Sequence, residues 1–327
     1  MKRQHKVGKI IFIIVLLVLV LVFLFSGLQV LESTIFSKGE AQEVTNEKKT
    51  IKRGEDEYFP RQDINVFLVM GIDKNGPVEE SDSYNNDGAA DTVMLLVFDE
   101  KDKTFSIINI NRDTMLDMTI LGIGGKPAGT YYGQLALAHT YGTGMEDSCE
   151  NTRDAVSELF YGITIDHYVS MNMDAVGILN DLVDGVTVNV EEDFSAVDPT
   201  ITQGEIKLQG EQAISYVRMR KEVGDQLNIS RMERQSEYMD GFMEALSVKL
   251  AAYPNFVIQA YDEVFDYIVT DCSSKTLSSL MERYKDYSFK EMVTLEGENK
   301  EGAAYMEFYP DEKALDELIL GTFYKKK

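Results

Sequence analysis

Four of the chain's ten arginines lie in one short segment, SYVRMRKEVGDQLNISRMERQ, residues 215–235. The protein as a whole is acidic, with 55 Asp and Glu residues against 32 Lys and Arg residues. A guanidinium is a planar, permanently charged fork that matches phosphate oxygens in a bidentate manner. Arginines concentrated in an acidic chain therefore indicate a phosphate-binding site. On composition alone, the favoured alternative is that Arg231 and Arg234 pair with Glu237 and Asp240 on a solvated helix face.

Two aspartates and a further arginine lie at the ends of three expected strands. The strands are INVFLVMGID (residues 64–73), TVMLLVFD (92–99) and TFSIININ (104–111). The second and third are expected to form a hairpin, with the first running parallel to the third in the same sheet. The end of the first strand, the start of the second and the end of the third would then share one sheet edge. Asp73, Asp91 and Arg112 are therefore predicted to be neighbours.

A pair of aspartates at a sheet edge suits Mg²⁺, with Mn²⁺ as an alternative, because carboxylates commonly hold such ions together with phosphates and water. With the arginines, this pair predicts a site for a diphosphate and a metal ion, where catalysis would neutralise charge on a leaving group. The alternative interpretation makes Asp91 and Asp113 turn or cap residues. Serine hydrolases, zinc proteases, P-loop nucleotidases and dinucleotide enzymes lack support because their motifs are missing.

The remaining pattern predicts an α/β fold with a central mixed sheet flanked by helices. Expected helices span residues 150–162, 174–185, 210–220 and 230–247, and expected strands span 166–173, 186–190, 290–297 and 304–309. Ser230 and Glu233 form a capping-box pattern at the start of the long helix, and Asp311 is expected to cap a last helix. His167 is assigned a structural role, and for His139 the structural interpretation is favoured over ligation.

The amino-terminal part predicts a membrane anchor. Residues 10–28 are almost entirely apolar, and four basic residues precede this run, so the amino end is expected in the cytoplasm and the rest outside. The expected organisation is a cytoplasmic tail (1–9), a transmembrane anchor (10–31), a stalk (32–62), a catalytic domain (63–250) and a carboxy-terminal extension packing on that domain (251–327). The extension is alternatively a small separate lobe.

The exterior part would carry a large negative charge, which argues against nucleic acid as a partner. It contains both cysteines of the chain, Cys149 and Cys272. A bridge between them and two free thiols are both compatible with the sequence.

Five motifs in order resemble the LytR-CpsA-Psr family of bacteria with thick peptidoglycan. The motifs are VFLVMGID (66–73), ADTVMLLVFD (90–99), INRDTM (110–115), ISYVRMR (214–220) and SRMERQ (230–235). The resemblance implies an α/β sandwich with a central mixed sheet and an apolar pocket for a polyprenyl chain. It also implies an extracytoplasmic, Mg²⁺-dependent phosphotransferase, which moves an anionic glycopolymer from a polyprenyl-diphosphate carrier to peptidoglycan.

The resemblance also implies roles for individual residues. Asp73 and Asp91 correspond to metal-associated aspartates. The substrate-binding positions would be Arg112, Arg218, Arg220, Arg231, Arg234 and Gln235. Arg112, Asp91 and Asp113 would take part in catalysis, with Asp91 or Asp113 accepting the proton of the incoming sugar hydroxyl.

The chain departs from the family pattern at three positions. Ala90 replaces a basic residue that usually comes before the second strand. Asn228 replaces an acidic residue on the long helix, with Asp225 nearby but out of register, and Asn111 replaces a proline in the INRDTM motif. The first two changes bear on substrate choice or rate more than on the fold.

The sequence leaves the transferred polymer open among teichoic acid, capsule and other cell-wall polysaccharides. Two other functional classes also remain open. The chain is alternatively a non-catalytic membrane-anchored sensor or scaffold that binds polyprenyl diphosphate or polymer without turnover, or an adhesin-like structural ectodomain.

Overall fold

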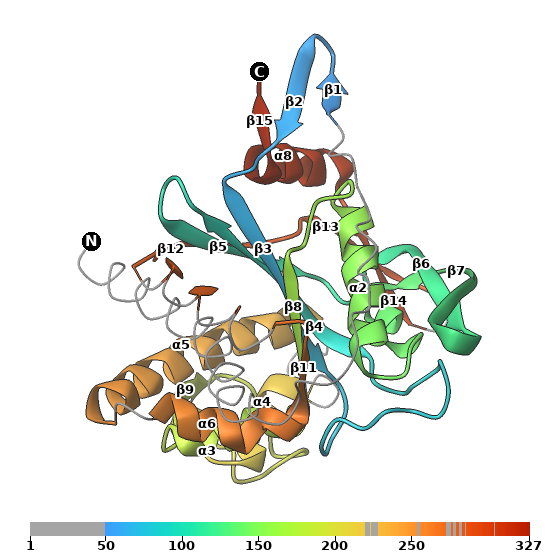
Figure 1. Cartoon of the computed structure of the whole chain (residues 1–327). Helices are drawn as coiled ribbons and strands as arrows, with labels where there is room; N and C mark the ends of the chain where they lie inside the picture. The colour runs from blue at the N-terminus through green and yellow to red at the C-terminus, as the bar shows by residue number, and fades with distance from the viewer. Residues whose placement is uncertain are drawn as a thin grey trace, which may run out of the picture.

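A six-stranded mixed β-sheet forms the centre of the computed structural model (Figure 1). The structure describes residues 50–219, 223, 228–253, 256–272, 276, 279–280, 283–284, 286–303 and 305–327. The spatial order of the sheet is β11 (Ile268–Thr270), β8 (His167–Asn172), β3 (Ile64–Ile72), β4 (Ala90–Asp99), β5 (Thr104–Ile110) and β12 (Ser288–Thr294). Strand β4 pairs antiparallel with β3 and with β5, so β3 and β5 run in the same direction. The predicted hairpin and the predicted parallel relation are both confirmed.

The central strands are apolar on both faces because each face is covered. On β3, Val66 and Leu68 face one side of the sheet and Phe67 faces the other, as the period of two requires. Figure 1 shows helices on both sides of these strands. The fold is therefore a three-layer α/β sandwich, as predicted.

The layer that contains the arginine-rich segment consists of helices and a small two-stranded sheet. Its elements are α3 (Met173–Leu182), β9 (Val186–Val190), β10 (Gly204–Leu208), α4 (Glu211–Arg218), α5 (Asn228–Ala252), α6 (Phe256–Val264) and η4 (Phe265–Tyr267). The predicted strand at residues 186–190 forms, but it pairs with β10 outside the central sheet. The capping-box prediction was wrong, because α5 begins at Asn228 and Ser230 lies inside its first turn.

The opposite layer contains a hairpin that the sequence interpretation missed. Its elements are β6 (Met115–Gly122), η2 (Ile123–Gly125), β7 (Lys126–Gln134), η3 (Leu135–Thr140), α2 (Glu146–Leu159) and α8 (Glu312–Phe323). Strand β7 is mostly exposed and contains Tyr131 and Tyr132 next to glycines, so it lacks a buried apolar alternation. Its partner β6 shows only a partial alternation. The predicted cap of the last helix is confirmed, since Asp311 accepts a hydrogen bond from the Ala314 backbone N–H at 2.8 Å.

Both ends of the described chain contribute strands to the domain. Strands β1 (Ile51–Arg53) and β2 (Asp56–Pro60) form a hairpin, and β2 pairs with β15 (Tyr324–Lys326). The stalk prediction for residues 32–62 was therefore wrong for this hairpin, which the carboxy-terminal strand fixes by backbone hydrogen bonds. The expected tail and anchor at residues 1–31, and stalk residues 32–49, lie outside the described residues. Within the described part, no helix combines the length and apolarity needed to span a membrane.

Residues after 250 are built into the same domain. Strand β12 adds to the edge of the central sheet, parallel to β5. Strands β13 (Gly297–Glu301) and β14 (Met306–Pro310) form a hairpin, which leads into α8. The Phe308 N–H of β14 donates to the Asp113 carbonyl at 2.9 Å, which ties this hairpin to the segment after β5.

The long loop between β3 and β4 is anchored at its second half. The buried Asn86 side chain donates to the carbonyls of His139 and Gly142, at 2.8 and 2.9 Å. Nδ1 of buried His139 lies 2.7 Å from the Gly88 carbonyl oxygen. Burial lowers the pKa of His139 to about 4. This histidine is therefore a neutral structural residue, which fixes the approach of the chain to Asp91.

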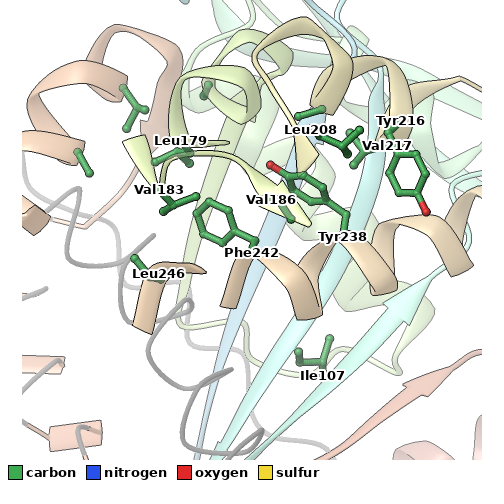
Figure 2. Close-up of a cluster of buried hydrophobic side chains, with 14 of the residues drawn as sticks. Ile107, Leu179, Val183, Val186, Leu208, Tyr216, Val217, Tyr238, Phe242 and Leu246 are labelled. Carbon is green, nitrogen blue, oxygen red and sulfur yellow. The ribbon is translucent and has the colours of Figure 1, made fainter. Parts of the chain in front are cut away.

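Helix α5 packs closely on β9 because a glycine lies at the contact. Figure 2 shows Tyr238 and Phe242 of α5 beside Val186 of β9 in the apolar layer. A Cβ at Gly241 would overlap the Thr187 carbonyl oxygen and come within 2.9 Å of Val186 Cγ1. This close approach sets the position of α5, and with it that of Arg231.

The Gly241→Ala variant is expected to lower the free energy of unfolding by about 1–3 kcal/mol, because the added methyl group overpacks the α5–β9 contact. Urea denaturation followed by circular dichroism measures the change. Gly321→Ala is the matched control, since this helical glycine of α8 has no atom within 4 Å of the added Cβ. It should be neutral or stabilising by up to about 1 kcal/mol. Equal unfolding free energies for both variants would contradict the packing argument.

Protein stability is expected to fall as the pH decreases from about 6.5 towards 4, in part because of His139. The pKa of this group is about 4 in the folded protein against 6.5 for an ordinary histidine, so only the unfolded chain binds its proton in this window. The contribution is at most about 1.4 kcal/mol per pH unit. Unfolding free energies at several pH values should show a smaller slope for His139→Gln than for wild type, whereas His167→Gln should leave this part of the slope intact.

Candidate functional site

The three residues predicted to share one sheet edge do so. Ile72 at the end of β3 pairs with Ala90 at the start of β4, and the Asp73 N–H donates to the Ala89 carbonyl at 2.8 Å. The Arg112 guanidinium, just past the end of β5, contacts the Asp91 carboxylate directly. Because β4 lies antiparallel between β3 and β5, Asp73, Asp91 and Arg112 come together at one sheet edge, although Asp73 and Arg112 are 39 positions apart in the sequence.

Asp91 is the centre of this cluster. Besides Arg112, it receives Arg231 from α5, whose Nη1 donates to Asp91 Oδ2 at 3.0 Å and whose Nη2 donates to the Asp91 carbonyl oxygen at 3.3 Å. Asp91 is 9% exposed and Arg231 is 4% exposed. Two permanently positive groups therefore converge on a single carboxylate in a largely desolvated place. These guanidiniums remain charged at all working pH values, so an incoming phosphate can compete with the carboxylate for them.

Asp113 positions Arg112 from behind. Its Oδ1 accepts hydrogen bonds from Arg112 Nε at 3.2 Å and from Gln134 Nε2 at 2.7 Å. The side chain of Asn111 accepts from the Asp113 N–H at 3.0 Å, which closes a tight turn around Arg112. Asn111 thereby restricts the backbone of this turn. Because Asp113 is only 1% exposed, it is placed to orient Arg112 rather than to meet an incoming sugar.

Arg218 extends the cluster to Asp73. It is the last residue of α4, and its Nη2 lies 2.7 Å from Asp73 Oδ1. Its Nη1 donates to Asn75 Oδ1 at 3.4 Å. Both Arg218 and Asp73 are about one-third exposed, so this pair forms the open side of the site while Arg231 and Asp91 form its buried side.

Arg234 contacts the protein at the end of α4. Its guanidinium donates to the carbonyls of Tyr216 and Met219 and pairs with Glu192 at 2.9 Å, so it secures the end of α4. The Arg234 Cζ atom lies over the ring of Phe194, 5.5 Å from the centroid of that ring. These contacts support the end of α4 and so the position of Arg218, and binding of substrate by Arg234 stays a prediction.

Gln235 also contacts the protein, at the border of the site. Its Nε2 donates to the Val217 carbonyl at 3.1 Å and to Thr92 Oγ1 at 3.3 Å, next to Asp91. Arg220 and Asp225 lie outside the described residues, as does the side chain of Asn228. Ala90 is fully buried in β4.

The sequence interpretation missed two residues that support the cluster. Gln134 at the end of β7 reaches Asp113 across 21 positions of sequence, and Asn75 contacts Arg218 across 143 positions. Neither residue lies in a recognisable motif. The only signal for Gln134 is its place directly before the apolar run LALA, where a buried polar residue needs a partner.

Both cysteines are buried free thiols, and burial raises the pKa of each to about 12. Cys272 lies with His167 and Asp271 in a group whose potential ligand atoms are within 4.8 Å of one another. This group lies at the start of β8, which is the opposite end of the sheet from Asp73. It is therefore separate from the arginine–aspartate cluster.

Asp73 and Asp91 offer a donor set that fits a hard divalent cation. Their carboxylates lie at the same sheet edge, and oxygen ligands are those that Mg²⁺ prefers. Each carboxylate is paired with an arginine. A phosphate ligand could bind these arginines in place of the carboxylates and so leave the carboxylate oxygens available to a metal ion. The expected apolar pocket for a lipid chain stays a prediction, because several residues around α5 and α6 lie outside the described part of the chain.

Comparison with known proteins identifies the relatives of this chain. A curated relative, "Polyisoprenyl-teichoic acid--peptidoglycan teichoic acid transferase TagU" of Enterococcus faecalis, is 31% identical over 222 residues. The match covers 67% of this chain and 65% of that protein, so the chain matches slightly less than two thirds of its relative's length.

Solved structures share the fold. Protein gbs0355 of Streptococcus agalactiae aligns with a TM-score of 0.64 at 22% identity, covering 80% of this chain and 89% of that one. A structure of TagT bound to LI-WTA aligns with a TM-score of 0.57 at 23% identity, covering 84% and 95%. The model of the LytR_cpsA_psr family matches residues 30–320. The order of its motifs, its fold and this match together establish that the chain belongs to the LytR-CpsA-Psr family.

Proposed function

We propose that this protein is an extracytoplasmic phosphotransferase, which attaches an anionic glycopolymer from a polyprenyl-diphosphate carrier to peptidoglycan. The observation that carries the proposal is the convergence of Arg112 and Arg231 on the buried Asp91, with Arg218 beside them. The name of the E. faecalis relative, a teichoic acid transferase, favours teichoic acid as the polymer over the capsule and other polysaccharides. The apolar run at residues 10–28 supports a single anchor with the catalytic domain outside the cell.

In the proposed reaction, the diphosphate takes over the guanidiniums of Arg112, Arg218 and Arg231. A hydroxyl oxygen of the acceptor attacks the phosphorus next to the polymer, and the bond from that phosphorus to the bridging oxygen breaks. The electron pair leaves with polyprenyl phosphate, where the arginines stabilise the developing charge. Asp91 accepts the hydroxyl proton, because Asp113 is enclosed behind Arg112.

We also propose that Asp73 and Asp91 hold Mg²⁺, or Mn²⁺, next to the phosphates. A divalent cation bound there would neutralise phosphate charge and fix the orientation of the diphosphate. Arg218 keeps Asp73 turned towards the site, since the two side chains are 2.7 Å apart. Arg234 supports the position of Arg218 because its guanidinium donates hydrogen bonds to backbone carbonyls at the end of α4.

Arg112→Ala is expected to reduce the rate of polymer transfer by about 10²–10³-fold, because one preorganised positive group no longer stabilises the leaving phosphate. The assay uses a synthetic polyprenyl-diphosphate glycan and peptidoglycan fragments, with mass spectrometry of both products. Arg153→Ala is the matched control: this arginine of α2 pairs with Glu150 and Asp154 outside the site and should leave the rate unchanged.

The same assay separates an enzyme from a non-catalytic sensor or scaffold. An enzyme requires that wild type releases polyprenyl phosphate and that Arg112→Ala loses transfer more than it loses donor binding. Donor binding by wild type with no release of polyprenyl phosphate, in the presence of Mg²⁺, would identify a sensor instead. Unchanged donor binding and transfer in both Arg112→Ala and Arg218→Ala would favour a structural ectodomain.

Removal of divalent ions with a chelator is expected to abolish transfer, and Mg²⁺ or Mn²⁺ should restore it. Asp73→Asn should raise the Mg²⁺ concentration for half-maximal rate by about tenfold or more, because a neutral amide is a weaker ligand than a carboxylate. Mn²⁺ titration by calorimetry provides a readout that does not depend on activity. Asp117→Asn, at an exposed position of β6, is the control. An identical metal response of Asp73→Asn and wild type would remove Asp73 from the metal site.

A further inference from the structure

A wide groove of about 1190 Å³ lies beside the arginine–aspartate cluster. Its lining comes from the ends of β5 and β12, the β13–β14 hairpin, the start of α8, and Glu233 of α5. Asn111 in this lining directly precedes Arg112, and Glu233 lies on α5 between Arg231 and Arg234. The groove therefore begins where the candidate phosphate site ends.

Strand β14 is held firmly against the segment that carries Arg112. The Phe308 N–H donates to the Asp113 carbonyl at 2.9 Å, and Gln134 Nε2 donates to the Met306 carbonyl at 2.8 Å. Gln134 also contacts the Asp113 carboxylate. One side chain thus joins the wall of the groove to the residue that orients Arg112.

The groove is lined mainly by acidic and amide side chains, whereas the neighbouring cluster presents guanidiniums that are paired with aspartates. Its lining includes the acidic residues Glu233, Glu296, Glu298, Asp311 and Glu312, against a single basic residue, Lys313. Its amide side chains come from Asn109, Asn111 and Asn299. Carboxylates oppose the entry of a polymer that carries phosphates along its length. Together, carboxylates and amides suit hydroxyl and acetamido groups as hydrogen-bond partners.

Exposed tyrosines continue from the groove along the neighbouring strands. Tyr309 of β14 lines the groove, and the side chains of Tyr132 on β7 and of Tyr305 just before β14 are 51% and 37% exposed. Tyr131 of β7 is 36% exposed. The Lys300 ammonium lies 4.9 Å from the centroid of the Tyr309 ring, so a ligand would stack on the other face. Exposed aromatic rings beside a polar groove are suited to the apolar faces and polar edges of sugar rings.

We propose that this groove binds the acceptor, a neutral glycan strand of N-acetylated sugars, and leads its receiving hydroxyl past Asn111 towards Arg112 and Asp91. This inference rests on the proposed transfer function, and it identifies the groove as the part of the same site that binds the acceptor. Donor and acceptor would then be sorted by charge, since the diphosphate meets guanidiniums while the uncharged glycan meets carboxylates, amides and tyrosines. The step itself stays the one described above, with the glycan hydroxyl as nucleophile.

The test measures binding of tetra-N-acetylchitotetraose, a neutral N-acetylated oligosaccharide, to the full chain in detergent micelles by calorimetry. Tyr309→Ala is expected to weaken binding at least tenfold. Tyr309→Phe should stay within about threefold of wild type, because it keeps the ring and loses only the hydrogen bond to Glu307. Tyr253→Ala, an exposed tyrosine at the end of α5, is the matched control and should bind like wild type.

A second measurement uses the transfer assay. Tyr309→Ala should raise the KM for the acceptor at least tenfold and leave the KM for the polyprenyl-diphosphate donor within twofold, whereas Arg112→Ala should leave affinity for the oligosaccharide within twofold. Absence of oligosaccharide binding to wild type would overturn the inference. So would displacement of the oligosaccharide by poly(glycerol phosphate), since the groove would then belong to the donor polymer.

The two proposals fail in different ways. Polymer transfer by wild type, with an acceptor KM that Tyr309→Ala does not change, overturns the acceptor groove and leaves the transferase intact. Tyr309-dependent oligosaccharide binding by a wild type that never releases polyprenyl phosphate overturns the transferase, and with it the acceptor role of the groove.

Discussion

The structure of the site depends on one carboxylate held between two guanidiniums. Asp91 is the second residue of β4, Arg112 follows β5 and Arg231 lies on α5, so this contact joins the central sheet to the helical layer that contains α5. Desolvation of three charged groups is costly unless they remain paired. Without the carboxylate, two cations would face each other in a largely buried place. The same cluster therefore holds α5 over the sheet edge and fixes two guanidiniums in positions where an anion can bind them.

Supporting contacts behind the cluster restrict how its members move. Asp113 and Gln134 fix Arg112 from one side, while Arg234 fixes the end of α4 and so the position of Arg218. A polar residue that is enclosed and hydrogen-bonded in this way has few alternative conformations. Preorganised positive groups lose little entropy when a phosphate arrives, which is the condition for effective charge stabilisation.

The carboxy-terminal segment is as much a part of this arrangement as the motifs are. Strand β12 extends the sheet next to β5, and β14 is tied to the turn that carries Arg112. The acidic groove is formed largely by this segment. An arginine-containing cluster next to an acidic groove without arginines gives two neighbouring surfaces with different preferences for charge. The proposed donor and acceptor sides correspond to these two surfaces.

The sequence by itself determined the layered α/β fold, the hairpin of β4 and β5, and the meeting of Asp73, Asp91 and Arg112, because strand periodicity and sheet direction are local properties that fix which ends share an edge. It did not determine the contacts of Arg234, since periodicity places a side chain on a helix face but does not identify the residues that this side chain meets. The β6–β7 hairpin, the support of Asp113 by Gln134, and the pairing of β2 with β15 were decided only by the tertiary structure. These contacts join residues that are distant in sequence, and their free energy comes from burial and hydrogen bonding that exist only once the layers have packed.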